Sequence, residues 1–279
     1  MRIDAHQHFW DLRRFRYPWM PQGESPLRRN FLPAQLEPIL ERNRFDGSIV
    51  VQANVIPEET RWLLDLAAEH EFIRGVVGWV DLTDARLGHT LDELQRHSKF
   101  KGARHLVHDE PDDHWLLRPE VLQGLRELAR RGIPYDLLLR PQHLRHVPVV
   151  AESVPELRVV IDHLAKPLIA AQRMEGWAED MAAAARIPQV FCKLSGMITE
   201  ADRRGWKAGH LRPYVQHALT VFGPERLMFG SDWPVCLLAG TWKEVLAAFT
   251  QAIGPQPVEV REKLLGGTAA KFYGIESTA

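Results

Sequence analysis

The stretch Ile3-Asp4-Ala5-His6-Gln7-His8-Phe9-Trp10 gives the first indication of the fold and of a functional site. It starts as an apolar strand and then presents two histidines separated by one residue. Side chains alternate between the two faces of a β-strand, so His6 and His8 are expected to point the same way. Two imidazoles that converge at a strand end can bind a metal ion or polarise a carbonyl group. The alternative is an ordinary pair of surface histidines.

A second stretch, Leu227-Met228-Phe229-Gly230-Ser231-Asp232-Trp233-Pro234, has the same form near the other end of the chain. Its short apolar run predicts a buried strand, and the carboxylate of Asp232 follows directly. The sequence therefore places a His-x-His pair after its first strand and an aspartate after a late one.

Strand-like and helix-like segments alternate between these two stretches. We expect strands at residues 2–6, 47–52, 75–80, 101–108, 133–139, 157–163, 190–196 and 227–229. We expect helices at residues 33–44, 57–71, 83–96, 116–131, 141–153, 177–185, 211–222, 241–252 and 258–273. Apolar strands that alternate with helices are typical of a parallel sheet covered by helices. Eight repeats predict a single α/β domain, a (β/α)8 TIM barrel over residues 1–279, with an open doubly wound sheet as the alternative.

Composition narrows the choice of partner and compartment. A net charge of -1 gives no electrostatic surface for nucleic acid or an anionic membrane, and favours a small-molecule partner. No apolar run approaches the length of a membrane span. Cys192 and Cys236 are too few for a disulfide framework and lie in apolar runs, so we expect buried thiols in a reducing cytoplasm. The first strand begins at once, which leaves no room for a signal peptide. A homo-oligomer is compatible with these features.

Residues 9–31 show no helix or strand pattern and are rich in proline, arginine and aromatic residues. A loop of this length inside a compact domain is usually functional or disordered. Its aromatic residues argue against disorder, because they need a surface to pack on. We therefore expect this segment to fold over the mouth of the active site.

Polar side chains follow several predicted strands at their carboxyl ends, where a (β/α)8 barrel places its catalytic groups. The set comprises His6, His8, Arg104, His105, His163, Lys193, Ser195 and Asp232. A single histidine at a strand end is usually structural, and Arg104 alone could be a surface charge. Lys193 differs because it lies inside an apolar run, where a buried ammonium group needs a partner. The gathering of the whole set at one end of the predicted barrel favours a functional site.

The two motifs, residues 4–10 and 230–234, together resemble those of the amidohydrolase superfamily, in its amidohydrolase 2 branch. Within that branch the chain is similar to the sugar-lactone hydrolases of the L-fuconolactonase and L-rhamnonolactonase type, over nearly its whole length. The resemblance implies a carboxylic ester hydrolase that opens an aldonolactone, such as L-fucono- or L-rhamnono-lactone, to the sugar acid.

The resemblance also implies roles for four residues. His6 and His8 match the first-strand pair of metal ligands. Asp232 matches the last-strand carboxylate, which binds metal and accepts a proton from the attacking water as general base. His163 matches a sixth-strand histidine that lies near the substrate or the metal, and we count it as both a catalytic and a metal-ligand candidate.

The chain departs from the superfamily pattern at two strands. The fifth predicted strand ends in Leu138-Leu139-Arg140 instead of a histidine, and the fourth has no bridging lysine. A two-metal site is therefore not expected. We expect one divalent metal ion, zinc, bound weakly or not required for activity, since the ligand set is incomplete and a lactone needs less activation than an amide. With or without it, the histidine cluster would polarise the lactone carbonyl.

The remaining candidates are predicted to contact the substrate. Arg104 and His105 would hold the carbonyl or a hydroxyl group, and Trp10 and Trp233 would pack against the sugar ring. Lys193 is the fifth candidate for substrate binding.

Two rival functions are retained. A metal-dependent decarboxylase of the same branch carries the same first-strand and last-strand signals but needs the fifth-strand histidine. A non-catalytic barrel that binds sugar acids needs no general base beside a carbonyl-polarising cluster. Both rivals are therefore less favoured than a lactonase.

Overall fold

The barrel is formed by eight parallel strands, which pair in the order β1-β2-β3-β4-β5-β6-β7-β8 in a computed structural model that describes residues 1–276. The strands are β1 (Ile3–Gln7), β2 (Gly47–Val51), β3 (Ile73–Gly78), β4 (Phe100–His105), β5 (Tyr135–Leu137), β6 (Val159–Ile161), β7 (Val190–Leu194) and β8 (Leu227–Phe229). Hydrogen bonds from the Asp232 amide to the His6 carbonyl (2.8 Å) and from the His8 amide to the Trp233 carbonyl (2.7 Å) join the chain after β8 to β1. The predicted (β/α)8 barrel is thus confirmed, and the open doubly wound sheet is wrong.

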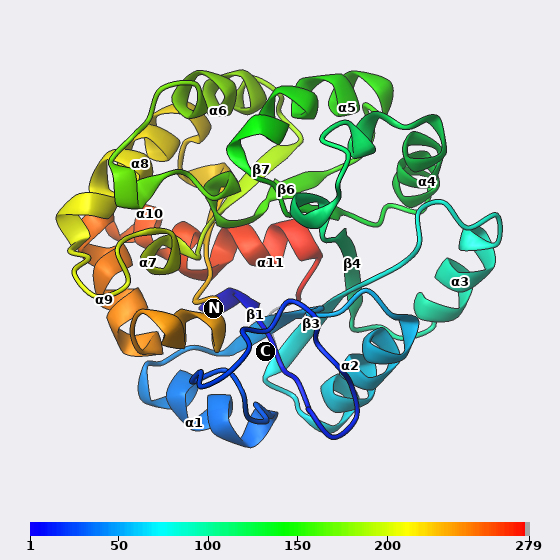
Figure 1. The fold of residues 1–279 in the computed structure, drawn as a ribbon, viewed down its shortest axis with the longest axis horizontal. Helices are drawn as coiled ribbons and strands as arrows, with labels where there is room; N and C mark the ends of the chain where they lie inside the picture. The colour runs from blue at the N-terminus through cyan, green and yellow to red at the C-terminus, as the bar shows by residue number, and fades with distance from the viewer. Residues whose placement is uncertain (277–279) are drawn as a thin grey trace.

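Helices surround the strands on the outside of the barrel, as Figure 1 shows. The helices of residues 1–276 are α1 (Pro33–Arg42), α2 (Pro57–Glu69), α3 (Leu87–Leu94), α4 (Pro119–Arg130), α5 (Val147–Ser153), α6 (Trp177–Ala185), α7 (Met197–Glu200), α8 (Ala208–Phe222), α9 (Trp242–Ile253), α10 (Val258–Glu262) and α11 (Thr268–Tyr273), of which α11 lies across one end of the barrel. Across residues 1–276, no helix has both the length and the apolar character needed to cross a bilayer.

Local sequence explains where several helices begin. Pro33, Pro57 and Pro119 open α1, α2 and α4, in the first turn, where a missing N–H costs nothing. At the start of α9, Thr241 accepts a hydrogen bond from the Glu244 amide at 3.3 Å, and the Glu244 carboxylate accepts one from the Thr241 amide at 2.6 Å. This reciprocal capping satisfies two amide groups that the helix itself cannot pair.

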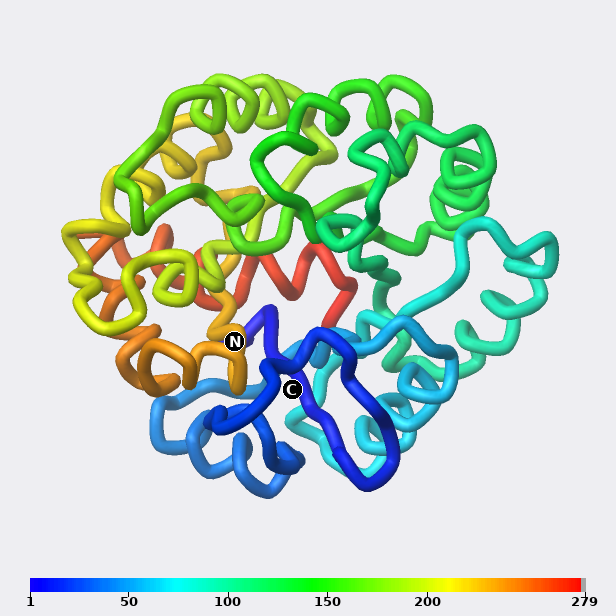
Figure 2. The backbone as a smooth tube through the Cα atoms, viewed as in Figure 1, coloured from blue at the N-terminus to red at the C-terminus, as the bar shows by residue number. Residues whose placement is uncertain are grey.

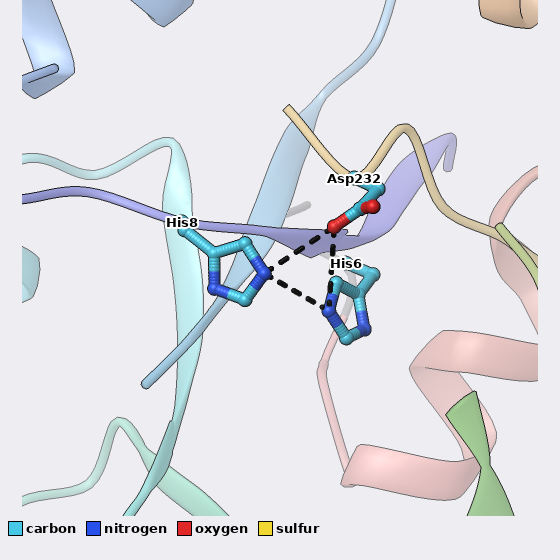
Figure 3. A group of neighbouring side chains, drawn as sticks. All are labelled: His6, His8 and Asp232. Atoms are coloured by element: carbon cyan, nitrogen blue, oxygen red, sulfur yellow. Dashed lines mark hydrogen bonds and ion pairs between the residues drawn. The ribbon is translucent and has the colours of Figure 1, made fainter. Parts of the chain in front are cut away.

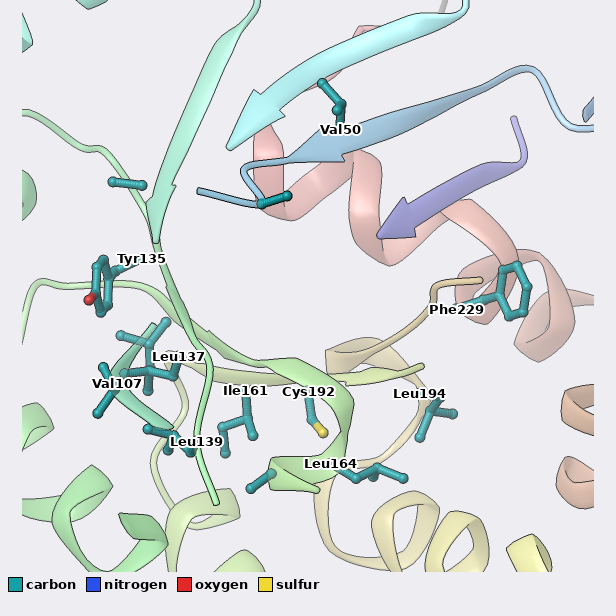
Figure 4. Packing of buried hydrophobic residues seen from close by; sticks show 14 of the residues in the cluster. Val50, Val107, Tyr135, Leu137, Leu139, Ile161, Leu164, Cys192, Leu194 and Phe229 are labelled. Carbon is teal, nitrogen blue, oxygen red and sulfur yellow. The ribbon is translucent and has the colours of Figure 1, made fainter. Parts of the chain in front are cut away.

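The larger hydrophobic core lies between the strands and the surrounding helices. Figure 4 shows part of it, with Leu137, Ile161, Cys192 and Leu194 on the outer side of consecutive strands. Adjacent residues of a strand point to opposite sides, so their neighbours in the sequence are left to face the barrel interior. Several of those interior residues are charged.

Helix α11 closes the amino-terminal end of the barrel and lies across its centre in Figure 1. Its Phe272 and Tyr273 belong to a second apolar cluster with strand residues such as Ile3 and Val77. The helix predicted at residues 258–273 is in fact interrupted at Lys263–Gly267. A Cβ atom on Gly266 would lie 2.5 Å from the Met1 carbonyl oxygen. Glycine at this position therefore lets the interrupted helix pass directly against the start of β1.

Other boundaries also differ from the sequence predictions. The strands predicted at 133–139 and 157–163 are shorter, the strand predicted at 75–80 begins earlier, and the helix predicted at 83–96 spans only Leu87–Leu94. The shortening of β6 has a clear cause. Four consecutive residues, His163 to Lys166, have φ between 53° and 56°, which is incompatible with an extended strand. His163 therefore lies in a left-handed turn after the strand.

The segment between β1 and α1 is ordered by aromatic packing. It is the dark blue loop beside α1 and α2 in Figure 2. Trp10 and Phe31 exchange backbone hydrogen bonds of 3.0 Å at its two ends. Their rings lie 5.3 Å apart, and Trp19 lies 5.5 Å from Trp10. The indole of Trp19 also donates to the Ala53 carbonyl at 2.6 Å, which attaches the segment to the chain after β2.

Candidate active site

The His-x-His pair and the late aspartate meet at the carboxyl end of the barrel (Figure 3). The Nε2 atoms of His6 and His8 lie 3.2 Å apart. Asp232 Oδ1 lies 3.4 Å from His8 Nε2 and 3.9 Å from His6 Nε2. The His8 ring is oriented from behind by a 2.7 Å contact between its Nδ1 and the Val51 carbonyl. Residues from the first and last strands therefore form one compact cluster.

His163 joins this cluster from the turn after β6. Its Nε2 lies 3.9 Å from Asp232 Oδ1, and its Nδ1 lies 2.8 Å from the Ser195 hydroxyl oxygen after β7. Both His163 and Asp232 have positive φ values, 53° and 56°. Such conformations cost energy for non-glycine residues and concentrate at functional sites, where the surrounding structure holds them in place.

Close packing of the backbone positions Asp232. A Cβ atom on Gly230 would lie 2.7 Å from His6 Cβ, so only glycine lets the chain after β8 approach β1 this closely. The Asp4 carboxylate then fixes the approach by accepting hydrogen bonds from the Ser231 amide and the Trp242 indole, both at 2.8 Å. Gly230 and Asp4 thus hold the chain after β8 against β1, which keeps Asp232 close to His6.

Behind the histidines lies a buried network of charges. Asp162 Oδ2 accepts a 2.9 Å hydrogen bond from Arg104, and Asp162 Oδ1 lies 3.0 Å from the Lys193 ammonium. Lys193 also contacts Asp136 Oδ2 at 2.5 Å and His6 Nδ1 at 3.1 Å. Because all five side chains are nearly inaccessible to solvent, each charge depends on these partners.

The burial and the charges set the protonation states. Burial lowers the pKa of His6 and of His163 well below the ordinary imidazole value, so both rings are neutral at neutral pH. Burial alone would raise the pKa of Asp232, but His163 and a hydrogen bond from His8 bring it below its ordinary value. Similarly, burial opposes ionisation of Asp162, yet Lys193 and His6 hold the pKa of Asp162 well below the usual range. The site therefore combines an ionised carboxylate with neutral imidazoles.

A cavity of about 390 Å³ opens above the cluster. Asp232, His8, His163 and Arg104 contribute to its walls. The rest of the lining is mixed: Trp19, Pro21, Leu27, Ala53, Leu106, His108, Asp109, Leu138, Arg140, Lys166, Arg203, Val235 and Leu238. Three of these residues come from the segment between β1 and α1. This volume lies within the range of small-molecule sites.

The other predicted substrate contacts lie elsewhere. Lys193 is fully buried beneath His6 and does not line the cavity. His105 is stacked on Trp115 with ring centroids 4.3 Å apart and bonded to Glu110 at 2.6 Å. The reason is strand alternation, because Arg104 points inward and its neighbour must point outward.

The two tryptophans named as ring-packing candidates are also absent from the cavity wall. Trp10 is buried, and its indole donates to the Arg29 carbonyl at 2.8 Å. Trp233 packs against Phe31 with ring centroids 5.2 Å apart. Both stabilise the segment that lies beside the cavity.

Sequence reasoning missed Asp162 and Asp136 as members of the site. Asp162 directly precedes His163, and Asp136 interrupts the apolar run of β5 just as Lys193 interrupts that of β7. Opposite charges inside two apolar strands indicate a buried pair, since neither charge is stable alone. The hydroxyl group of Tyr273 donates to both Asp136 oxygens at 2.9 Å, and nothing in the sequence pointed to that contact.

The ligand atoms of His6, His8 and Asp232 all lie within 4.8 Å of one another and could hold a metal ion. Tetrahedral zinc with bonds near 2.0–2.1 Å separates its ligand atoms by about 3.3 Å. The separations here are 3.2, 3.4 and 3.9 Å, so the three residues suit a small divalent cation. His6, Asp162 and His163 form a second group that could hold a metal ion. Its carboxylate, Asp162, is already paired with Arg104 and Lys193, so the first group suits a cation better.

Comparison with known proteins agrees with this geometry. The amidohydrolase family model matches residues 3–275. The L-fucono-1,5-lactonase of Burkholderia ambifaria is 40% identical, over 99% of this chain and 96% of its own, and that of Burkholderia multivorans is 38% identical, over 100% and 98%. A crystal structure of a Burkholderia multivorans amidohydrolase with bound zinc superposes with a TM-score of 0.92, at 38% identity and with 99% and 100% of the two chains covered. The chain belongs to the amidohydrolase family.

Proposed function

We propose that this protein is an enzyme that hydrolyses a sugar lactone, with L-fucono-1,5-lactone as the foremost candidate. One observation carries the proposal: Asp232 Oδ1 lies within 3.9 Å of ring nitrogens of His6, His8 and His163 at the wall of a cavity. A carboxylate beside the neutral imidazoles of His6 and His163 suits attack of water on an ester carbonyl. The two relatives named as L-fucono-1,5-lactonases support the choice of substrate.

Asp232 is the general base. It is ionised at neutral pH because His163 and His8 lower the pKa of its carboxyl group despite burial. It removes a proton from a water molecule as the water oxygen bonds to the lactone carbonyl carbon. The electron pair of the C=O bond moves to the carbonyl oxygen, which becomes negatively charged.

Arg104 and the histidine cluster stabilise this oxyanion. Arg104 lines the cavity, and its guanidinium group is held in place by Asp162, so little reorganisation is needed as charge develops. The oxyanion then re-forms the carbonyl, the ring C–O bond breaks, and Asp232 returns its proton to the departing ring oxygen. The product is a hydroxy acid, which releases one proton on ionisation.

A divalent metal ion, which we propose to be zinc, would be held by His6, His8 and Asp232. When bound, it would supply a Lewis acid for the lactone carbonyl. Behind the ion site, Asp162 Oδ1 lies 3.4 Å from His6 Nδ1 and can accept a hydrogen bond from an N–H group there. With its proton on Nδ1, the His6 ring has its lone pair on Nε2, which faces His8 and Asp232. Binding of this ion is expected to be weak.

The lining of the cavity suits a deoxy sugar. Lys166 and Arg104 offer charged hydrogen-bond donors for hydroxyl groups, whereas Leu106, Leu138 and Leu238 offer an apolar surface for a methyl group. We place the reaction in the cytoplasm, because Cys192 and Cys236 are both buried free thiols. Monomer and homo-oligomer are both compatible with this proposal.

The test is proton release, followed with a pH indicator, from a panel of aldonolactones with and without a chelator. We expect rapid release from L-fucono-1,5-lactone, slower release from lactones without the methyl group, and loss of activity in Asp232→Asn. Failure to open any lactone would overturn the proposal. Carbon dioxide release from aromatic acids would then identify a decarboxylase, and saturable binding of a sugar acid without turnover would identify a binding protein.

A further inference from the structure

Arg104 is buried beside the candidate metal site and is held there by several contacts. Its Nη2 donates to the Gln52 carbonyl at 2.5 Å, and its Nη1 donates to Asp162 Oδ2 at 2.9 Å. The same Nη1 lies 3.3 Å from His6 Nε2. Arg104 is only 3% exposed, so these contacts fix the guanidinium group.

The contact between Arg104 and His6 uses a specific lone pair. A neutral imidazole has one N–H group and one ring nitrogen with a free lone pair, and a guanidinium group can only donate. Lys193 Nζ, which also can only donate, lies 3.1 Å from the other ring nitrogen, Nδ1. With the His6 proton on Nδ1 and directed at Asp162 Oδ1, 3.4 Å away, the hydrogen bond from Arg104 engages the lone pair on Nε2. A metal ion held with His8 and Asp232 needs that same lone pair, since Nε2 is the His6 atom that faces both of them.

We propose that Arg104 sets the metal affinity of this site by competing with a divalent cation for His6 Nε2. The inference rests on the metal site proposed above, but its test needs no turnover. Arg104 opposes the ion in two ways: it occupies the lone pair, and it places a fixed positive charge next to the position that the ion would take.

Arg104 is not free to move away when an ion arrives. Asp162 and the Gln52 carbonyl hold its two terminal nitrogens, and the buried Lys193 on the other oxygen of Asp162 adds a second cation nearby. An ion therefore enters against charges that stay in place. The site is expected to exchange zinc readily, and the guanidinium group remains beside the carbonyl whether or not an ion is bound.

The experiment is a zinc titration of chelator-treated protein in competition with a fluorescent zinc chelator. Arg104→Met removes both the charge and the donor, and Arg104→Gln removes the charge while keeping a donor for Asp162. Both variants are expected to bind zinc at least about ten times more tightly than the wild type, the range typical of residues that contact metal ligands. Cobalt can replace zinc as a spectroscopic probe, and its visible absorption should saturate at lower cobalt concentration in both variants.

Two controls make the result decisive. Arg140→Met removes an arginine of the same cavity that pairs with Asp109, and its zinc affinity should stay within about twofold of wild type. Adding His8→Ala to Arg104→Gln should abolish the gain, since the ion would lose a ligand.

The proposal is overturned if Arg104→Gln binds zinc no more tightly than wild type while its thermal melt remains cooperative. It is equally overturned if the gain survives without His8, because the ion would then lie elsewhere. Should Arg104→Met fail to fold, Arg104→Gln alone decides. A protein that shows this zinc behaviour but opens no lactone would refute the proposed activity and leave the role of Arg104 intact.

Discussion

The backbone amide of Asp232 donates a 2.8 Å hydrogen bond to the carbonyl oxygen of His6. This bond is part of the closure of the barrel, since it joins the chain after β8 to β1. It also holds the backbone of Asp232, the proposed general base, beside that of His6, the first histidine of the pair. Formation of the site is therefore tied to closure of the fold, and a change that loosens the contact between β8 and β1 should impair stability and activity together.

Replacement of Asp232 by Asn should remove the general base with little effect on the fold, because the amide has nearly the same shape. Loss of a general base typically costs 10²–10⁴ in rate, so we expect kcat to fall about a thousandfold in the proton-release assay. Asp109→Asn is the matched control, since Asp109 lines the same cavity but pairs with His108 and Arg140. Near wild-type turnover in Asp232→Asn would exclude Asp232 as the base.

His105→Ala should retain activity. The His105 ring is stacked on Trp115 and bonded to Trp79 at 2.9 Å and to Glu110 at 2.6 Å, outside the cavity. We expect kcat/KM within about twofold of wild type. The melting temperature should fall, because Trp115 and Glu110 lose their contacts with the removed ring. His163→Ala, measured in parallel, should lose most of its activity. A large rise in KM for His105→Ala would instead place this residue at the substrate.

Lys193→Met should destabilise the protein strongly. Lys193 lies between Asp136 and Asp162, and its removal leaves buried carboxylates without their cation. Breaking a buried pair costs about 3–5 kcal/mol, which urea unfolding monitored by tryptophan fluorescence can measure. Lys101→Met, at a half-buried position of β4 where the ammonium group donates to the Gly274 carbonyl, should destabilise the protein by about 1 kcal/mol, well below the loss in Lys193→Met.

A double variant distinguishes charge from packing at this position. Lys193→Met combined with Asp136→Asn removes both members of one pair, so part of the lost stability should return. If the double variant is no more stable than Lys193→Met, then the Lys193 side chain acts through packing and not through its charge.

Glu59 should make stability depend on pH. Its Oε2 accepts hydrogen bonds from the amides of Ala53 (2.9 Å) and Asn54 (2.7 Å), and burial raises the pKa of Glu59 from 4.5 to about 7. The native state therefore favours the protonated form more than the unfolded state does. This stabilisation is fully present below about pH 4.5 and is lost as pH rises through about 7, with an upper limit on the order of 3 kcal/mol.

Glu59→Gln tests this pH dependence. The glutamine oxygen can accept both amide hydrogen bonds and carries no charge, so we expect the urea midpoint to vary less between pH 5 and 8 than in the wild type. Glu58→Gln, one position earlier on the exposed side of α2, is the control and should leave the wild-type profile unchanged. A profile for Glu59→Gln identical to that of wild type would show that Glu59 does not titrate in this range.

Zinc should raise the melting temperature of chelator-treated protein, because an ion that binds only the native state stabilises it by mass action. At a free zinc concentration of 100 Kd the gain would be about 2.7 kcal/mol. His8→Ala should abolish the increase. His143→Ala, which breaks a pair with Asp113 outside the cavity, should retain it. An undiminished increase in His8→Ala would place the ion at another site.

The sequence by itself determined the barrel and which candidate catalytic residues gather at one end of it. Apolar strand runs separated by helices are local patterns, and a parallel closed sheet gathers their carboxyl ends at one face whatever the details of packing. That rule was enough to predict that His6, His8, His163 and Asp232 lie together, although His6 and Asp232 are more than 200 positions apart in the chain. Strand alternation also explains the division between Arg104, which points inward, and His105, which does not.

Only the tertiary structure decided which groups surround the reactive residues. Of the partners of Lys193, Asp136 lies on β5 and Asp162 directly follows β6, and Tyr273 reaches Asp136 from α11. Trp10 and Trp233 likewise belong to the two sequence motifs yet pack away from the cavity. Buried ion pairs and aromatic packing are contacts between distant segments, so their geometry depends on how the barrel closes and not on local periodicity.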